Sequence, residues 1–337
     1  MDRRDFLKVS GAAAVTAGAG AVKTQAAPPI LPGATELRLA TPGQSDLPGF
    51  GPDRLARRIE LATGGRYRIV LDAAAADADL AFGDAGGQLS RHPAFAVFAG
   101  LPLAQGLDPA TLQTWLAVGG GQMLWDDLAA GFGFKPLVAG HTGASAGLWA
   151  TRRLEAVSDL SGARLHVAGL AADVVRALGA TPIHLAAADL RGALAEGRID
   201  AAEHLGPLAE VAPGLQPLAG RLYHPGLNGN GAVLSLDVRK QVWDGMSAAD
   251  QAIFEACAAE AYQLSLAEAQ AHALIAAQVV TPAKWPVRLA LGRELGHALE
   301  RAARDVVAGV AGLDFDARRI LDSYAAFRAM LGEAHTV

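Results

Sequence analysis

A serine within a turn of small residues is the first candidate for chemistry in this 337-residue chain. The stretch 143–147 has the sequence GASAG, which matches G-x-S-x-G, the turn that presents a nucleophilic serine between a strand and a helix. Asp200 and His224 follow Ser145 in the order that such a triad requires. However, no His-Gly-Gly-type oxyanion segment is present, because the glycine run 119–121 lacks the histidine. A serine hydrolase using Ser145 is therefore the weaker alternative, and we expect that the chain is not an enzyme.

Histidine and cysteine side chains are candidates for metal ligands. His166 and His204 show none of the local spacings that are typical of histidine metal sites. Cys257 is the only cysteine in the sequence, which excludes an intramolecular disulfide and a thiolate metal cluster. It shares an apolar helical stripe with Ile253 and Ala261, so a core position is expected. We predict neither a metal nor a cofactor.

Composition and charge exclude several classes of protein. Hydrophobic residues make up 51% of the chain and charged residues 19%, which is too apolar and too weakly charged for a disordered protein. The net charge is −5 and no basic block is visible, so no nucleic-acid partner is expected. The length suggests two domains, because a single core seldom grows past ~250–300 residues.

The first 27 residues have the features of an export signal. Arg3 and Arg4 are followed by Lys8, and residues 9–22 then form an uncharged run of small, weakly hydrophobic residues. This run is too short to span a membrane, which takes ~20 residues. A T-Q-A-A segment at 24–27 offers a cleavage site. We predict a twin-arginine signal peptide over residues 1–27 and a mature protein in the periplasm.

Strand-like and helix-like patterns alternate along the rest of the chain. Strands are expected at 36–40, 67–71, 78–82, 136–139, 164–167, 183–185, 199–204 and 233–238. Helices are expected at 52–62, 109–118, 123–131, 171–178, 189–196, 247–278, 287–310 and 317–331. Ser247 and Asp250 form a capping-box pattern at the start of the longest helix. This order predicts an α/β fold with a largely parallel sheet.

Several ordered motifs resemble one family of binding proteins. The stretch 158–169, SDLSGARLHVAG, is similar to the D-L-x-G-x-K-x-R-x-x-G segment of the periplasmic substrate-binding proteins of TRAP transporters. Residues 193–203, ALAEGRIDAAE, resemble the family signature A-L-x-x-G-x-I-D-A-A-E. Gly206-Pro207 and the sequence YHPG at 223–226 resemble the branch that binds 2-oxoacids and related carboxylates. The likeness covers nearly all of the chain after residue 27.

The resemblance implies a two-lobe periplasmic-binding-protein (Venus flytrap) fold with mixed or parallel sheets and a long C-terminal helical segment. The expected first lobe is 34–150 with 231–285, the second is 151–230, and the helices of 286–337 pack on or across the lobes. The implied function is to capture a small, carboxylate-containing solute between the lobes. The protein would then deliver this solute to the small and large membrane subunits of a TRAP permease.

Two alternatives stay open at this point. The chain could be a degenerate or signalling binding protein without a role in transport. By resemblance to the 2-oxoacid branch, the C-terminal helix from Ala317 would either exchange between the protomers of a homodimer or pack on its own lobe.

The ligand site departs from the family pattern. The arginine that binds the ligand carboxylate in relatives is His166 here, and the glutamine of their G-N-T-G-x-Q loop is Ser145. The tryptophan after the signature glutamate is His204, whereas the glutamate itself, Glu203, is retained. The family sequence P-G-W-H-E becomes PGLNG at 225–229. These changes predict a ligand other than a small, sodium-bridged 2-oxoacid, and the loss of bulk at Leu227 and Gly229 suggests a larger or differently shaped one.

The expected ligand-binding residues combine the retained and the altered positions. They are Ser145, Trp149, Arg164, His166, Glu203, His204, Leu227 and Asn228. Histidine has an ordinary pKa of about 6.5, so these imidazoles would supply mostly neutral hydrogen bonds near pH 7. Arg164 shares a strand face with His166, and it either reaches the ligand carboxylate or lies at an exposed rim. If a carboxylate binds, His166→Ala should weaken it more at pH 6 than at pH 8.

Overall fold

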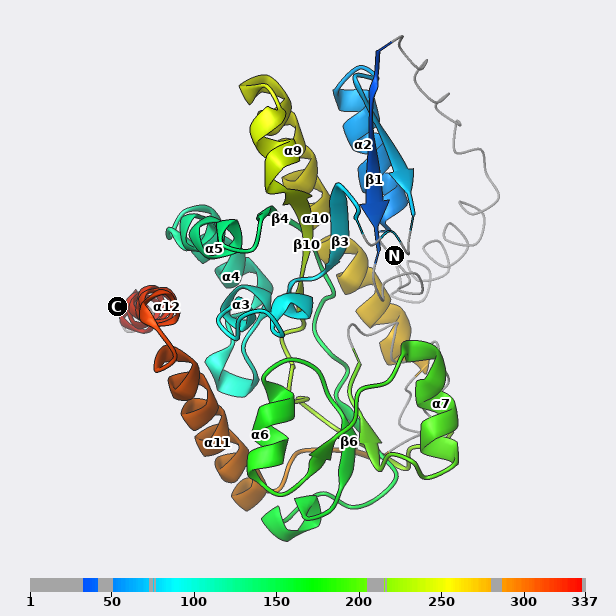
Figure 1. Cartoon of the computed structure of the whole chain (residues 1–337). Coiled ribbons are helices and arrows are strands. Elements are labelled where there is room, and N and C mark those ends of the chain that lie inside the picture. The colour runs from blue at the N-terminus through cyan, green and yellow to red at the C-terminus, as the bar shows by residue number, and fades with distance from the viewer. Residues whose placement is uncertain are drawn as a thin grey trace, which may run out of the picture.

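Two sheets, in different parts of the molecule, organise the chain in the computed structural model (Figure 1). The structure describes residues 33–41, 51–72, 77–204, 217–279 and 287–334, with Ala75 and Leu215. The predicted signal peptide lies outside these residues. Within them, no helix combines the length and the apolar character that a membrane crossing requires.

The first sheet has the strand order β2-β1-β3-β10-β4. Its strands are β1 (Thr35–Ala40), β2 (Tyr67–Leu71), β3 (Leu80–Asp84), β4 (Phe134–His141) and β10 (Val233–Arg239). β1 is parallel to β2 and β3, whereas β10 runs antiparallel between β3 and β4. The chain therefore leaves this first lobe after β4 and returns to it with β10.

The second sheet has the order β11-β9-β5-β8-β6-β7. Its strands are β5 (Leu148–Ala150), β6 (Arg164–His166), β7 (Thr181–Pro182), β8 (Ala201–Ala202), β9 (Arg221–Tyr223) and β11 (Val287–Leu289). β5 belongs to this sheet, so the expected lobe boundary after residue 150 comes too late. The chain enters the second sheet at Gly147, directly before β5. The φ angle of Gly147 is +139°, and a Cβ at this position would overlap with the carbonyl oxygen of Tyr223. Only glycine lets the chain pass so close to β9.

Helices cover both sheets, as the alternating pattern predicts. The α-helices are α2 (Pro52–Ala62), α3 (Phe95–Ala99), α4 (Pro109–Ala117), α5 (Gly121–Ala130), α6 (Ala171–Ala177), α7 (Ala187–Ala195), α9 (Lys240–Gly245), α10 (Ala248–Val279), α11 (Arg293–Ala311) and α12 (Phe315–Ala334). Short 3₁₀ turns are η1 (Ala85–Gln88), η2 (Leu103–Gln105) and η3 (Val157–Leu160). The expected cap of α10 is present, because the Ser247 hydroxyl oxygen accepts from the backbone nitrogen of Asp250 at 3.1 Å. The predicted α/β fold class is confirmed.

Three expected elements differ from the structure. The strand expected at 183–185 lies at 181–182, because the Leu185 nitrogen donates to the His166 ring at 3.3 Å instead of to a strand carbonyl. The strand expected at 199–204 shortens to Ala201–Ala202. The expected helix 287–310 begins only at Arg293, since residues 287–289 form β11, parallel to β9 at the edge of the second sheet.

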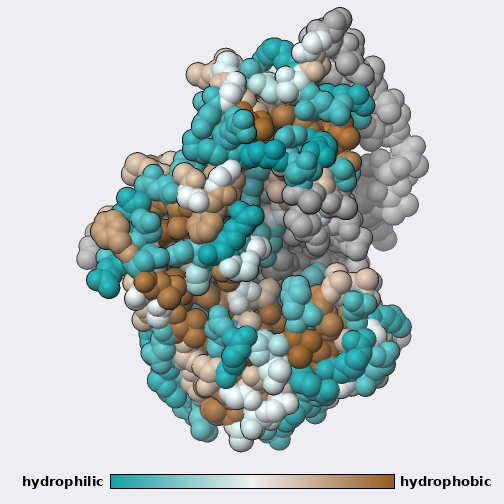
Figure 2. Space-filling view, in the orientation of Figure 1, coloured by the Kyte–Doolittle hydropathy of each residue, from teal (hydrophilic) through white to brown (hydrophobic). Residues whose placement is uncertain are grey.

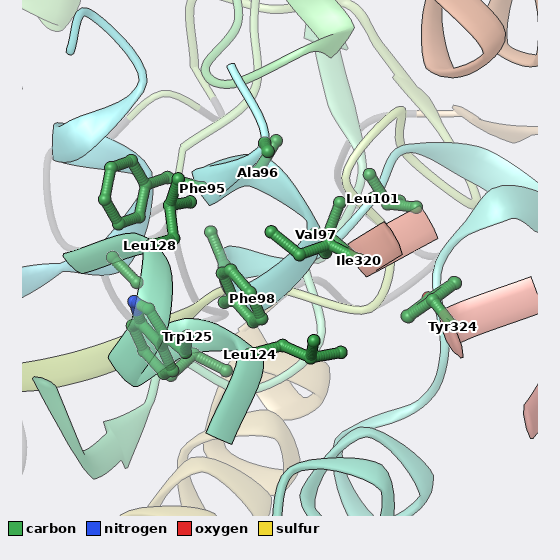
Figure 3. Close-up of a cluster of buried hydrophobic side chains, with 14 of the residues drawn as sticks. Phe95, Ala96, Val97, Phe98, Leu101, Leu124, Trp125, Leu128, Ile320 and Tyr324 are labelled. Carbon is green, nitrogen blue, oxygen red and sulfur yellow. The ribbon is translucent and has the colours of Figure 1, made fainter. Parts of the chain in front are cut away.

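The C-terminal helices connect the two lobes of the same chain. Leu295 and Leu299 of α11 are buried in the core of the second lobe. Ile320 and Tyr324 of α12 are buried among the helices of the first lobe, as Figure 3 shows. Of the two alternatives for the last helix, packing on its own chain describes this structure, and exchange in a dimer stays a prediction. Hydrophobic residues also reach the surface on the left of Figure 2, where α11 and α12 run in Figure 1.

Stacked aromatic rings form the centre of the helical core in the first lobe (Figure 3). The Phe98 ring lies between Trp115 and Trp125, at centroid distances of 5.6 and 5.1 Å. Tyr324 meets Trp115 edge-on at 5.1 Å, an arrangement that adds to the energy of burial. The last helix is therefore part of this core rather than an appendage.

The hydroxyl of Tyr324 fixes α12 to the loop that precedes α4. It accepts from the Leu107 nitrogen at 3.0 Å and donates to the Gln105 oxygen at 3.1 Å. We expect Tyr324→Phe to lower the free energy of unfolding by ~1–3 kcal/mol, because it leaves a buried N–H without its acceptor. Urea unfolding measures the change, with Tyr67→Phe in the first lobe as the control. An equal loss in both variants would contradict this role.

Candidate functional site

Two segments, residues 142–147 and 224–232, connect the lobes and are bonded to each other. The Thr142 nitrogen donates to the Ala232 oxygen at 2.9 Å, and the Ala232 nitrogen donates to the Thr142 hydroxyl at 2.9 Å. Further along, the Ser145 nitrogen donates to the Gly229 oxygen at 3.1 Å. The segments therefore form one paired connection, which we call the crossover. A movement of one lobe against the other therefore involves the backbone of the crossover.

Polar residues gather at the carboxyl ends of parallel strands in both lobes. In the second lobe His166 ends β6, and Glu203 and His204 follow β8, which is parallel to β6. In the first lobe Asp84 ends β3, which is parallel to β1. Open α/β sheets bind their ligands outside the carboxyl ends of the strands. This placement singles out the region between the two sheet edges as the candidate site.

Glu203 is buried in the second lobe and holds the crossover in place. Its Oε2 accepts from the Leu227 nitrogen at 2.7 Å, and its Oε1 accepts from the Asn228 nitrogen at 3.0 Å. The Ser145 hydroxyl is a third donor, from the other crossing segment. Burial raises the pKa of Glu203, and these hydrogen bonds act against that rise.

The surroundings of Glu203 do not fit a bound cation. Both carboxylate oxygens face N–H donors, which a cation next to them would repel. The retained glutamate is therefore a structural acceptor here. Among the described residues, no three His, Cys, Asp or Glu side chains are grouped so that they could hold a metal ion.

Three histidines form a cluster beside Glu203. The His166 ring lies 5.8 Å from that of His204 and 6.2 Å from that of His184, between centroids. Nδ1 of His166 lies 3.2 Å from the Ile183 carbonyl oxygen. Burial lowers the pKa of His166 to about 4, with a smaller effect from His204, and burial also lowers the pKa of His204. At neutral pH these two imidazoles are uncharged hydrogen-bonding groups.

This pKa corrects the expected pH dependence of His166. An imidazole with a pKa of about 4 is neutral at both pH 6 and pH 8, so substitution should change solute binding equally at both. The protonation of His166 instead affects the stability of the folded protein. Its folded pKa lies below the unfolded value of about 6.5, so its contribution is present above pH ~6.5 and is lost as the pH falls towards 4.

We therefore expect His166→Asn to flatten the decline in unfolding free energy between pH 6.5 and pH 4. Urea unfolding across this range measures the effect, and the NMR titration of the His166 ring gives its midpoint directly. A midpoint near pH 6.5 would contradict the effect of burial on this ring.

A small cavity lies where the two lobes meet, and both contribute to its wall. Its volume is about 20 Å³, which is enough for one water-sized group. Asp84 lines it from the first lobe, Ala168 and Gly169 line it from the second, and Asn228 lines it from the crossover. Asn228 also donates from Nδ2 to the Ala168 oxygen at 3.2 Å. Of the residues expected from sequence to bind the ligand, Asn228 is the one that lines this cavity.

Three expected ligand-binding residues have other contacts. Trp149 is fully buried in the core between the second sheet and α7, and Leu227 is 2% exposed in the core on the other face of that sheet. Arg164 is ion-paired with Asp200, with its Nη2 3.2 Å from Oδ1, at an exposed position. Arg164 was expected either to reach the ligand carboxylate or to lie at an exposed rim, and the structure has the rim position. We therefore leave Trp149, Leu227 and Arg164 out of the proposed site.

The serine-hydrolase alternative also fails on geometry. The Ser145 hydroxyl is bonded to Glu203, and its oxygen accepts from the Gly147 nitrogen at 3.1 Å. Asp200 is paired with Arg164, and His224 bonds through Nδ1 to the Ala146 carbonyl oxygen at 3.1 Å. The three residues do not form a relay from acid to histidine to serine.

Sequence reasoning missed two residues of the site, Asp84 and His184. Asp84 follows a strand that was expected at 78–82 and enters a glycine-containing turn, so the rule on carboxyl ends of strands could have found it. His184 follows β7 next to His166. Its position depends on a strand end that was expected three residues later, at residue 185 instead of 182, so the pattern gave no signal.

The proteins that this chain resembles are described as solute-binding proteins. The family model "bacterial extracellular solute-binding protein, family 7" matches residues 108–287, more than half of the chain. A monocarboxylate 2-oxoacid-binding periplasmic protein of Nostoc sp. is 27% identical over 316 residues, covering 87% of this chain and 84% of the relative. The likeness extends beyond the residues matched by the family model.

Two solved structures share the fold. A TRAP transporter solute-binding protein from Bordetella bronchiseptica, with copurified calcium and picolinate, has a TM-score of 0.83 at 22% identity, covering 91% of this chain and 95% of that one. A TRAP periplasmic solute-binding protein from Pseudoalteromonas atlantica, with sodium and pyruvate, has a TM-score of 0.82 at 21% identity, covering 89% and 95%. The two-lobe fold and the family match agree: this chain belongs to family 7 of the bacterial extracellular solute-binding proteins.

Proposed function

We propose that the chain captures a small, carboxylate-containing solute between its lobes and delivers it to the membrane subunits of a TRAP permease. The observation that supports this most directly is the cavity whose wall is shared by Asp84 of the first lobe, Ala168 of the second and Asn228 of the crossover. A solute held by both lobes stabilises the closed arrangement, because its contacts exist only when the lobes meet. The neutral imidazoles of His166 and His204 would act as hydrogen-bond partners of the carboxylate.

We also propose that residues 1–27 direct export by the twin-arginine route. Replacing Arg3 and Arg4 with lysine should leave the protein in the cytoplasm, which immunoblotting of periplasmic and cytoplasmic fractions would detect. Export of this variant at the normal level would contradict the proposed route.

Identification of the copurifying solute is the decisive experiment. The protein is isolated from its native periplasm, and native mass spectrometry identifies the bound molecule. A solute that binds only the folded state raises the unfolding free energy by ~2.7 kcal/mol at a hundredfold excess over its Kd. Asn228→Ala should remove this stabilisation, whereas Gln263→Ala, on an exposed face of α10, should keep it. Retention of binding by the Asn228 variant would contradict the site.

Pyruvate is a second probe. It tests whether this site binds a 2-oxoacid through a bridging cation, and the contacts of Glu203 and His166 predict that it does not. We expect no thermal shift with pyruvate, with or without sodium. The reason is that Glu203 is occupied by N–H donors and no arginine takes the place of His166. Micromolar, sodium-dependent binding of pyruvate would overturn this part of the proposal.

A further inference from the structure

The cavity between the lobes offers hydrogen-bond acceptors. Its lining contains two polar side chains, Asp84 and Asn228, among glycine, alanine and one leucine. Oδ1 of Asp84 accepts from the Gly86 nitrogen at 2.8 Å, which fixes the carboxylate at the end of β3. Nδ2 of Asn228 donates one hydrogen bond to Ala168, and its side-chain carbonyl oxygen is an acceptor that can meet a ligand.

The backbone adds a further acceptor at the same place. The carbonyl oxygen of Gly231 points toward Gly100, since a Cβ on Gly100 would lie 2.9 Å from it. Both glycines line the cavity. A carboxylate and a side-chain amide therefore lie around a space that fits one water-sized group, with the Gly231 carbonyl nearby. Such a set matches a group that has several donors and a positive charge.

The charges around the cavity also favour a ligand with a positively charged group. No lysine or arginine is among the described residues that line the cavity, and the guanidinium of Arg164 is paired with Asp200. A ligand that carried only a carboxylate would meet Asp84 without a compensating positive charge. A like charge of this kind costs affinity at a desolvated site.

We propose that Asp84 binds an ammonium group of the solute, so that the ligand is a small zwitterion of the amino-acid type rather than a 2-oxo or 2-hydroxy acid. This inference rests on the proposed function and names the ligand class for the same site. The ammonium fills the water-sized space between Asp84 and Asn228, and the carboxylate of the ligand extends toward the histidine cluster. Burial raises the pKa of Asp84 to about 6, so the carboxyl is mostly ionised at pH 7.5.

The test compares amino acids with hydroxy acids of the same carbon skeleton. Isothermal titration calorimetry at pH 7.5 uses three pairs: L-alanine and L-lactate, L-norvaline and L-2-hydroxyvalerate, and L-leucine and L-2-hydroxyisocaproate. In at least one pair we expect the amino acid to bind at least about tenfold more tightly, the size of effect that a charge-assisted hydrogen bond provides.

Two matched variants locate the preference. Asp84→Asn keeps an oxygen that accepts from Gly86, so thermal unfolding should show a folded protein, but the preference for the amino acid should disappear. Asp237→Asn is the control. Like Asp84, Asp237 is a carboxyl of the first sheet whose pKa burial raises to about 6, but it does not line the cavity. This variant should keep the preference.

The outcomes separate this inference from the proposed function. If probes bind but no amino acid binds more tightly than its hydroxy acid in any of the three pairs, or if a preference survives in Asp84→Asn, the inference alone is overturned. A copurified solute without an amine would do the same. If no probe binds and no solute copurifies, the proposed function and the inference are both overturned.

Discussion

Replacing Gly231 with alanine is expected to lower the free energy of unfolding by ~3 kcal/mol or more and to abolish solute binding. Gly231 lies in the crossover with φ of +78°, a left-handed conformation that alanine adopts only with strain. In addition, a Cβ at this position would overlap with the carbonyl oxygen of Gly143 in the other crossing segment. Because that atom belongs to the backbone, the two segments must move apart.

The consequence extends to the ligand site. The Gly231 nitrogen donates to the Asn228 oxygen at 2.8 Å, so displacement of Gly231 also moves a wall of the cavity. Thermal unfolding gives the loss of stability, and calorimetry with the copurified solute gives the loss of affinity.

Gly162→Ala is the control that distinguishes the effect of the atomic overlap from the effect of the strained backbone conformation. Gly162 has φ of +67°, but no atom lies within 4 Å of the position of its Cβ. Gly162→Ala should therefore lower the free energy of unfolding by only ~1–2 kcal/mol, because only the backbone conformation is strained, and it should leave solute binding intact. If the two variants lose the same stability, the close approach of the crossing segments does not matter.

The family and the order of elements could be predicted from sequence because they depend on local patterns. The helix cap at Ser247 and the apolar stripe that contains Cys257 were predicted from a few neighbouring residues, and both are present. The signature 193–203 likewise identified the family without any knowledge of the fold. Such features can be predicted from a single sequence because all residues of each motif are neighbours in the chain.

The contents of the site could be predicted only in part, because they depend on contacts between distant segments. Trp149 is an aromatic residue close to the crossover, and the pattern cannot tell which face of β5 it occupies. Its burial against α7 follows from pairing with β8 and β9, which come more than fifty residues later in the chain. Similarly, the pKa of His166 depends on burial that the sequence does not specify.

Glu203 shows how one residue can keep its identity while its surroundings change. The signature glutamate was expected to face the ligand, as its family position implies. In the structure, both of its oxygens accept backbone N–H groups of the crossover.

Glu203→Ala is therefore expected to destabilise the protein by ~3–5 kcal/mol, as for other buried charged groups that lose their network. The substitution removes the acceptor of the Leu227 and Asn228 nitrogens and of the Ser145 hydroxyl at once. The Leu227 nitrogen is buried, so its lost hydrogen bond is not replaced easily by water. Because Asn228 lies in the released segment, solute binding should be lost as well.

The matched control is Glu196→Ala, in the same signature. Glu196 is exposed and pairs with Arg198 at 2.7 Å, so its removal should cost less than ~1 kcal/mol. Ser145→Ala removes one of the three donors and should fall between the two variants. Urea unfolding at pH 7 ranks all three. Glu203→Ala and Glu196→Ala of equal stability would show that the crossover does not depend on this carboxylate, and the retained glutamate would then have to be reassigned to the ligand.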